Sequence, residues 1–261
     1  MRPGDKLVRP GNKLVYRAVL WDKDGTLVDS LGSWVRLERE LALLLGEWVG
    51  LSPTQRPLAA EQVLTALGVV EGRPTAQGLL ASGTPETILT AFYTTFNRWT
   101  KLPELTEFMV QARQFLEPLV QHHTPDAFPG LPEIVRHLAQ GGILQGVGTS
   151  DSVAGAEREL GALGLLPFFT VLIGSDHLSG SDQVRPKPHP DTVFRFARLS
   201  SIPVEQLLVI GDTPADEEMA LTSGADFWGV LWGTSSREDF RPTTRVLTDP
   251  TPLKSLTTLN S

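Results

Sequence analysis

Two aspartates one residue apart, Asp22 and Asp24, follow a short apolar run and precede Gly25. An apolar run that ends at a glycine predicts a buried strand followed by a loop. Side chains two positions apart on an extended segment point to the same side, so both carboxylates can face one site. Such a cluster suits a hard divalent cation, and an aspartate can also act as a nucleophile in phosphoryl transfer. Taken alone, Asp-x-Asp-Gly is more typical of a solvated turn, so the rest of the chain must decide.

Further polar residues stand at the ends of later apolar runs. Residues 143–148 are followed by a threonine and a serine, and residues 207–210 by a glycine and two aspartates. Between these segments a lysine lies in a loop stiffened by prolines. Because ligands of open parallel sheets bind beyond the carboxyl ends of the strands, we expect these groups to share one site with Asp22. They are Thr149, Ser150, Lys187, Asp212 and Asp216.

The elements that must position these residues alternate between strand and helix patterns from residue 127 onward. Strands that alternate with helices predict right-handed βαβ units and a parallel sheet covered on both faces. The apolar run before Asp22 adds a further strand to this sheet. The expected strands are 16–21, 143–148, 169–173, 207–210, 227–231 and 246–247, and the expected helices are 131–138, 152–163, 191–199 and 216–223.

Residues 31–123 have a different, helical pattern without a strand signal. Thr84-Pro85-Glu86 supplies an N-cap, a proline at the first helical position and an acid near the positive end of the helix dipole. The pattern predicts helices through 37–48, 60–67, 85–101 and 104–122, with a loop at 71–83. This block lies between the first two strands of the sheet. We therefore expect an α/β core domain of residues 1–30 and 124–261 and an inserted helical domain of residues 31–123.

Composition limits the class of protein. The chain has 261 residues, 41% hydrophobic and 20% charged, which is ordinary for a globular protein with a sizeable core. A formal net charge of -7 argues against nucleic acid and anionic membranes as partners. There is no cysteine, which excludes thiolate chemistry and cysteine-bound metals. No segment has the apolar pattern of a signal peptide or a membrane span, so we expect a cytoplasmic protein.

The four polar motifs, in this order, resemble the haloacid dehalogenase-like (HAD) hydrolase superfamily. Its signatures are Asp-x-Asp-Gly-Thr after the first strand, a Thr or Ser after the second, a Lys before a later helix, and Gly-Asp-x-x-x-Asp after the next strand. The matches run from Asp22 to Asp216. The helical insertion resembles the small α-helical cap of the phosphoglycolate phosphatase and β-phosphoglucomutase branch. The resemblance implies a Rossmann-like, doubly wound parallel sheet with an inserted cap.

The resemblance also implies roles for the aspartates. Asp22 would attack phosphorus and form an aspartyl-phosphate intermediate. Asp24 would protonate the leaving oxygen and then deprotonate the attacking water. Mg²⁺ would be held by the Asp22 carboxylate, the Asp24 main-chain carbonyl and Asp212. Asp216 would act through waters of the ion or by orienting the lysine of the site.

Four residues would bind the phosphoryl group. Thr149 would hydrogen-bond one of its oxygens, and main-chain N–H groups near Ser150 could cradle it. Lys187 would offset the negative charge of the nucleophile and the phosphoryl group. Gly25 would allow the tight turn that follows the first aspartate.

Lys23, between the two aspartates, departs from the resembled family, which usually has an apolar residue there. Strand alternation predicts that its side chain points away from both carboxylates and that its effect is neutral. For the other candidates a structural or surface role is favoured: a surface pair at a helix end, a helix start, packing against cap helices, or surface charge. These are His122, His123, His189, Trp34, Trp48, Arg36, Arg39, Arg98 and Lys101.

The motifs thus favour a Mg²⁺-dependent phosphatase, similar to phosphoglycolate phosphatase, that acts on a small phosphorylated metabolite. A phosphomutase of the β-phosphoglucomutase type is the nearest alternative, and a non-catalytic HAD-like binding protein is an alternative of another class. Dehalogenase chemistry is disfavoured because it does not need the second aspartate, and phosphonate hydrolysis because no cap lysine stands out. The sequence gives neither the substrate nor the oligomeric state.

Overall fold

The computed structural model describes residues 16–29, 31–121, 126–178 and 184–256, and the expected pair His122 and His123 lies outside them. In the described part, a six-stranded parallel sheet has the order β5-β4-β1-β6-β7-β8. The register places β1 between β4 and β6, with Trp21 opposite Val147 and Ile210. The strands are β1 (Ala18–Trp21), β4 (Leu144–Gly148), β5 (Val171–Ile173), β6 (Leu207–Gly211), β7 (Asp226–Val230) and β8 (Arg245–Leu247). The predicted parallel sheet is confirmed.

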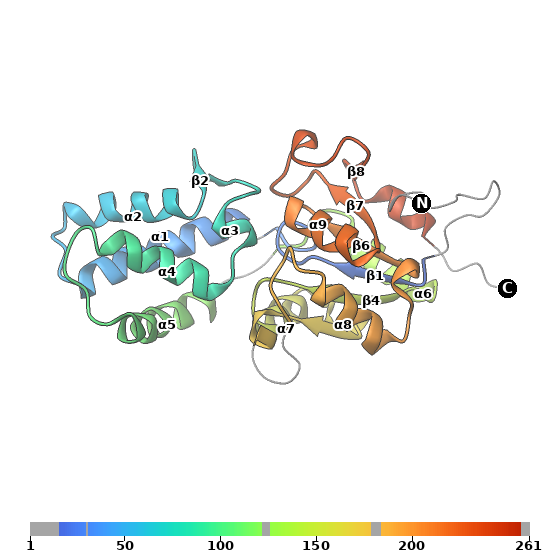
Figure 1. Ribbon diagram of the computed structural model, residues 1–261, viewed down its shortest axis with the longest axis horizontal. Helices are drawn as coiled ribbons and strands as arrows, with labels where there is room; N and C mark the ends of the chain where they lie inside the picture. The colour runs from blue at the N-terminus through green and yellow to red at the C-terminus, as the bar shows by residue number, and fades with distance from the viewer. Residues whose placement is uncertain (1–15, 30, 122–125, 179–183, 257–261) are drawn as a thin grey trace.

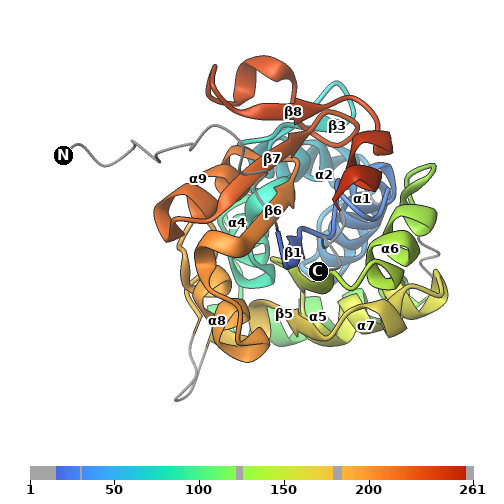
Figure 2. The same cartoon turned by 90° about the vertical axis from the view of Figure 1, so that its right-hand side faces the viewer.

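Helices cover both faces of this sheet, as Figure 2 shows from the end of the strands. The helices α6 (Leu131–Gln140) and α7 (Val153–Ala162) pack on the face to which Val19 and Trp21 point, and α8 (Asp191–Ser200) and α9 (Pro214–Ser223) pack on the face of Ala18 and Leu20. Successive residues of β1 are thus buried on opposite faces, as expected for a central parallel strand. Short 3₁₀ turns are at Leu166–Phe168, Ser175–Leu178, Val204–Gln206, Arg237–Asp239 and Thr251–Ser255.

Residues 31–121, between β1 and α6, form a helical block beside the sheet (Figure 1). Its own apolar core includes Phe92, Phe96 and Phe108, and Trp48 packs against Phe108 with a ring-centroid distance of 6.0 Å. The packing role expected for Trp48 is therefore confirmed. The helices are α1 (Leu31–Trp48), α2 (Gln55–Ala66), α3 (Leu79–Ser82), α4 (Pro85–Phe96) and α5 (Leu105–Gln121).

The block differs from the sequence expectation in its loop. The strands β2 (Val69–Val70) and β3 (Arg73–Pro74) form an antiparallel hairpin, and α3 follows them where a continuous loop was predicted. Two-residue strands and a one-turn helix are too short to give a periodic pattern, so the prediction of an uninterrupted helical block was wrong here. Among the described residues, no helix is long and apolar enough to span a lipid bilayer.

Candidate active site

Three buried aspartates meet at the carboxyl ends of β1 and β6. One carboxylate oxygen from each of Asp22, Asp212 and Asp216 lies within 4.8 Å of the others. The ammonium group of Lys187 is 2.5 Å from Asp22 Oδ1 and 2.7 Å from Asp216 Oδ1. The sheet therefore brings together four of the residues that the sequence predicted. Asp216, expected to act through waters or by orienting Lys187, contacts the lysine and also lies inside the acidic cluster.

Burial and mutual repulsion set the electrostatics of this cluster. Burial raises the pKa of Asp22 well above its usual value, with Asp216 and Asp212 adding to the effect and Lys187 opposing it. Burial and the charge of Asp216 raise the pKa of Asp212 to about 6. Burial alone would lower the pKa of Lys187, but the charges of Asp216 and Asp22 outweigh it and raise that pKa. Three carboxylates thus face one ammonium group, and a divalent cation with oxygen ligands fits the excess negative charge.

Asp212 is held by a close approach of two loops. Its Oδ2 accepts a hydrogen bond from the Thr234 main-chain N–H at 2.7 Å, and its Oδ1 accepts one from Thr26 Oγ1 at 3.3 Å. Gly25 has a φ of +81°, and a Cβ there would lie 2.3 Å from Asp212 Oδ2. A Cβ at Gly233 would lie 2.2 Å from the Gly25 carbonyl oxygen. Only glycine fits at either position.

Sequence reasoning identified Gly25 but missed Gly233 and Thr234. These two residues follow β7, at the same edge of the sheet as the other candidates. The rule that ligands bind beyond the carboxyl ends of parallel strands applies to them as well. A polar Gly-Thr-Ser-Ser run after a predicted strand was therefore the signal that could have found them.

Asp216 and the residues after β4 are fixed by local capping. Thr213 caps α9, and its Oγ1 donates to Asp216 Oδ2 at 2.6 Å. Thr149, at the end of β4, donates its main-chain N–H to the Ile173 carbonyl, and its Oγ1 accepts from the Asp151 N–H at 3.0 Å. Its hydroxyl group is therefore fixed at the edge of the sheet, next to the ends of β1 and β6.

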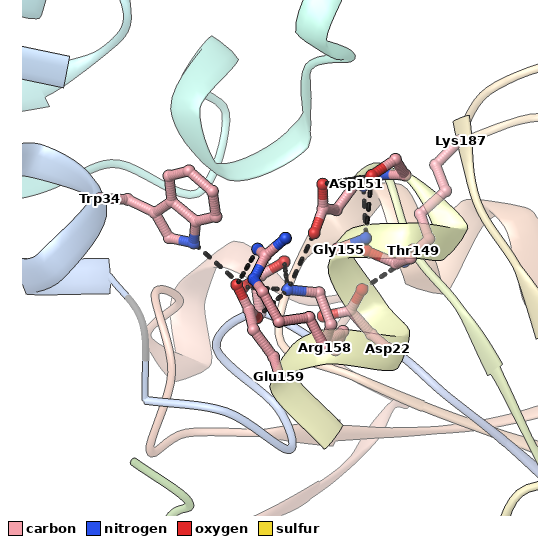
Figure 3. A network of polar contacts seen from close by, with 11 residues as sticks. Asp22, Trp34, Thr149, Asp151, Gly155, Arg158, Glu159 and Lys187 are labelled. Carbon is pink, nitrogen blue, oxygen red and sulfur yellow. Dashed lines mark hydrogen bonds and ion pairs between the residues drawn. The ribbon is translucent and has the colours of Figure 1, made fainter. Parts of the chain in front are cut away.

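The contacts of Lys23 contradict the orientation and the neutral effect that the sequence predicted for its side chain. Its side chain is fully buried and its Nζ lies 3.0 Å from Asp24 Oδ2 and 3.3 Å from Asp151 Oδ2, in addition to an ion pair with Glu159. Figure 3 shows Asp151 and Glu159 of this network beside α7. Burial alone would lower the pKa of Lys23, but the three carboxylates outweigh it and raise that pKa. Lys23 therefore compensates buried acidic groups around Asp24.

Trp34 was expected to pack within the helical block. In the structure its side chain instead faces the site. Its indole Nε1 donates a hydrogen bond to Asp24 Oδ1 at 3.2 Å, so α1 contacts the loop after β1 directly (Figure 3). His189 fits its expected place at the start of a helix, with Nδ1 2.9 Å from Asp191 Oδ1. Arg39 pairs with Glu61 on the surface, as expected for surface charge.

A cavity of about 490 Å³ lies between the helical block and the sheet. Its strand-end wall comprises Asp22, Asp24, Thr149, Ser150, Asp151, Ser152, Gly155 and Arg158. Its helical wall comprises Trp34, Glu38, Leu80, Ala81, Gly83, Pro85, Ile88, Leu89, Arg113, Leu116, Glu117, Val120 and Gln121. The expected site residues Asp22, Asp24, Thr149 and Ser150 thus line the same cavity.

A family model, curated relatives and solved structures give comparisons that agree with one another. The model of the haloacid dehalogenase-like hydrolase family matches residues 16–224. An N-acetylmuramic acid 6-phosphate phosphatase of Pseudomonas putida is 24% identical over 85% of this chain and 86% of that protein. A phosphoglycolate phosphatase of Shigella boydii is 26% identical over 83% of this chain and 82% of that protein. A solved HAD-superfamily hydrolase of subfamily IA from Geobacter sulfurreducens has a TM-score of 0.57 at 18% identity, covering 91% of this chain and 94% of that one.

Proposed function

The chain belongs to the haloacid dehalogenase-like hydrolases, and on that premise we propose that it is a Mg²⁺-dependent phosphatase of a small phosphorylated metabolite. The observation that carries the proposal is the buried cluster of Asp22, Asp212, Asp216 and Lys187 at the strand ends. Two relatives, named for N-acetylmuramic acid 6-phosphate and for phosphoglycolate, support a phosphomonoester as the substrate class.

The nucleophile in this proposal is the Asp22 carboxylate. It attacks phosphorus, so that a bond forms between Asp22 and the phosphoryl group while the bond from phosphorus to the leaving oxygen breaks. Lys187, which contacts Asp22 and Asp216, stabilises the negative charge on the nucleophile and the phosphoryl group. In this proposal Thr149 Oγ1 and the main-chain N–H of Ser150 bind a phosphoryl oxygen.

Asp24 moves the proton in both halves of the reaction. It gives a proton to the leaving oxygen and then takes one from the water that attacks the aspartyl-phosphate on Asp22, which restores both residues. Its carboxylate is held on two sides, by Lys23 at 3.0 Å and by Trp34 at 3.2 Å. Because Trp34 belongs to α1, the position of the proton donor depends on the helical block.

The acidic cluster would hold Mg²⁺ through the Asp22 carboxylate, the Asp24 main-chain carbonyl and Asp212. When bound, the ion supplies positive charge that neutralises the phosphoryl oxygens and the carboxylates. The helical wall supplies an apolar cover, because Leu80, Ile88 and Leu89 line the cavity opposite these charges. Water excluded from this space strengthens the electrostatic interactions inside it.

The test is hydrolysis of phenyl phosphate by the purified full chain with and without Mg²⁺. We expect Asp22→Asn to lower kcat by at least about 10³-fold, because the nucleophile is lost. Asp126→Asn removes an exposed carboxylate outside the cavity and is the matched control. Mass spectrometry of quenched wild-type protein should find phosphate on the peptide that carries Asp22. Equal activity of wild type and Asp22→Asn, or full activity in a chelator, would contradict the proposal.

A further inference from the structure

Glu38 of α1 is a buried carboxyl group for which no hydrogen bond is found among the described residues. Its exposed fraction is 4%, and its Oε2 has no hydrogen-bond partner among the described residues. It lines the cavity together with Asp24 and Thr149. Burial raises the pKa of Glu38 to about 8. At neutral pH the group therefore holds its proton, so one oxygen can donate a hydrogen bond and the other can accept one.

This carboxyl group differs from the other buried acidic groups near the cavity. Asp22 contacts Lys187, and Asp24 contacts Lys23 and Trp34. A buried polar group without a partner is unfavourable, and its presence in a native structure calls for a ligand or another functional reason. Glu38 faces the space in which the leaving group of a bound phosphomonoester would lie. A polar group of the substrate is therefore the partner that the cavity can provide.

The charges of the cavity favour an uncharged leaving group. Beside the protonated Glu38, the cavity is lined by the acidic residues Asp22, Asp24, Glu117 and Asp151. The described cations of the lining already have carboxylate partners, because Arg113 lies 3.4 Å from Glu86 and Arg158 lies 3.5 Å from Glu159. A carboxylate on the leaving group would enter this acidic lining and would compete with Glu86 and Glu159 for the two arginines.

The size and the lining of the cavity fit a leaving group that is larger than two carbon atoms. A cavity of about 490 Å³ is in the range that encloses drug-sized ligands. A two-carbon leaving group would leave most of this volume to water. Apolar side chains around Glu38, among them Leu80, Leu116 and Val120, suit the C–H faces of a sugar ring or polyol. A hydroxyl group on the same molecule would satisfy the carboxyl group.

We propose that Glu38 selects the substrate, by hydrogen-bonding a hydroxyl group of an uncharged, sugar-sized leaving group. This inference rests on the proposed phosphatase function and names the substrate class of that same site. Glu38 contacts the leaving group and takes no part in phosphoryl transfer. Removing the carboxyl group of Glu38 should therefore change the relative kcat/KM values of different phosphomonoesters. It should leave the transfer of the phosphoryl group intact.

The test compares matched pairs of substrates that differ by a carboxylate. N-acetylglucosamine 6-phosphate pairs with N-acetylmuramic acid 6-phosphate, and 2-hydroxyethyl phosphate pairs with 2-phosphoglycolate. Phenyl phosphate, which has no hydroxyl group on its leaving group, reports the chemistry alone. We expect wild type to prefer the uncharged member of each pair by at least about 10-fold in kcat/KM, and the sugar phosphate to be the best of the five.

Variants then connect this preference to Glu38. Glu38→Met fills similar space without hydrogen bonding and should lower kcat/KM for N-acetylglucosamine 6-phosphate by about 10- to 100-fold, mainly through KM. It should change phenyl phosphate hydrolysis by less than about 2-fold. Glu38→Gln keeps a hydrogen-bond donor and an acceptor, so its kcat/KM for N-acetylglucosamine 6-phosphate should fall less than that of Glu38→Met. Glu107→Gln removes an exposed carboxylate of α5 outside the cavity; it is the matched control and should change the hydrolysis of neither substrate.

The outcomes separate the two proposals. If Glu38→Met lowers hydrolysis of phenyl phosphate as much as that of the sugar phosphate, or changes neither, Glu38 is a structural residue and the inference is overturned. A wild-type preference for the carboxylate members, or hydrolysis of phenyl phosphate alone, overturns it as well, while the phosphatase proposal stands. If wild type hydrolyses none of the five substrates with Mg²⁺, the phosphatase proposal fails and the inference fails with it.

Discussion

On the strand-end wall of the cavity Asp22 and Asp24 lie beside buried lysines, whereas on the helical wall Oε2 of Glu38 has no hydrogen-bond partner among the described residues. Lys187 contacts Asp22 and Asp216, and Lys23 contacts Asp24. Around Glu38 the wall is mainly apolar. The two walls face the same space but carry opposite electrostatic arrangements.

The difference shows how the tasks of the site are divided. A reaction that transfers a phosphoryl group needs charges that are fixed before the substrate arrives, and the strand-end wall provides them. A wall that must recognise a leaving group needs a polar group that the leaving group completes, and Glu38 provides that. We therefore expect substitutions on the strand-end wall to lower the hydrolysis of all substrates. Substitutions on the helical wall should lower the hydrolysis of only those substrates whose leaving group contacts the substituted residue.

The largest effect should follow from Lys187→Met. The variant removes the ammonium group that lies between the buried carboxylates of Asp22 and Asp216. The negative charges of the nucleophile and of the phosphoryl group then lose the cation that stabilises them. We expect kcat for phenyl phosphate and for N-acetylglucosamine 6-phosphate to fall alike, by about 10²- to 10³-fold. Lys101→Met, on the exposed surface of the helical block, should leave both unchanged. A selective loss for one substrate would break the proposed division between the walls.

The acidic groups of the strand-end wall were largely predictable from the sequence. Asp22, Thr149 and Asp212 each follow an apolar run, and parallel strands end at one edge of the sheet whatever the rest of the chain does. The burial of Lys23 was not predictable in this way. Alternation along β1 sets the direction in which its side chain leaves the backbone, but its partners Asp151 and Glu159 come from a segment more than 120 residues away.

The same limit applies to Glu38 and to the loop after β7. A glutamate within a helical pattern is normally a solvent-facing residue, but α1 packs against α2, α5 and β3, and Glu38 is buried. The Gly-Thr-Ser-Ser run marks the end of a predicted strand, but it does not indicate that the Thr234 main-chain N–H donates to Asp212. The sequence thus predicts chemistry that depends on strand ends and misses what depends on tertiary packing.

A large loss of stability should follow from Lys23→Met. The lysine is fully buried beside Asp24, Asp151 and Glu159, and removing one partner of buried ion pairs costs about 3–5 kcal/mol. Denaturant unfolding measures this cost. The double variant with Glu159→Gln removes an acid together with its cation and should recover part of it. A cost below about 1 kcal/mol, or no recovery in the double variant, would show that the charges of this wall are not compensated by Lys23.

Mg²⁺ should stabilise the strand-end wall even without substrate. A ligand that binds only the folded state adds about 2.7 kcal/mol at a concentration 100 times its Kd. We expect the Tm of wild type to rise with Mg²⁺ and that of Asp212→Asn to stay constant, because Asp212 lies in the acidic cluster. Glu117→Gln on the helical wall should respond as wild type does. A Mg²⁺ response that persists in Asp212→Asn would place the ion elsewhere.

The pH dependence of stability tests the helical wall alone. Burial raises the pKa of Glu38 to about 8 from a usual value of 4.5. Between these values the unfolded chain is ionised at this position while the folded chain keeps its proton. The folded state then binds more protons, so its stability falls as pH rises, by at most about 1.4 kcal/mol per pH unit. Below pH 4.5 and above pH 8 the contribution of Glu38 is constant.

Glu38→Gln has no proton to lose, so the stability of this variant minus that of wild type should increase from pH 5 to pH 8 and then level off. The other charged groups of the cavity, Asp22, Asp24, Arg113, Glu117, Asp151 and Arg158, are present in both proteins and cancel in this difference. Glu107→Gln removes an exposed carboxylate of the same helical block and is the control. Urea unfolding at each pH measures the three proteins. A pH-independent difference would mean that Glu38 is compensated like the acids of the strand-end wall, and the two walls would then not differ in the way that the substrate preference requires.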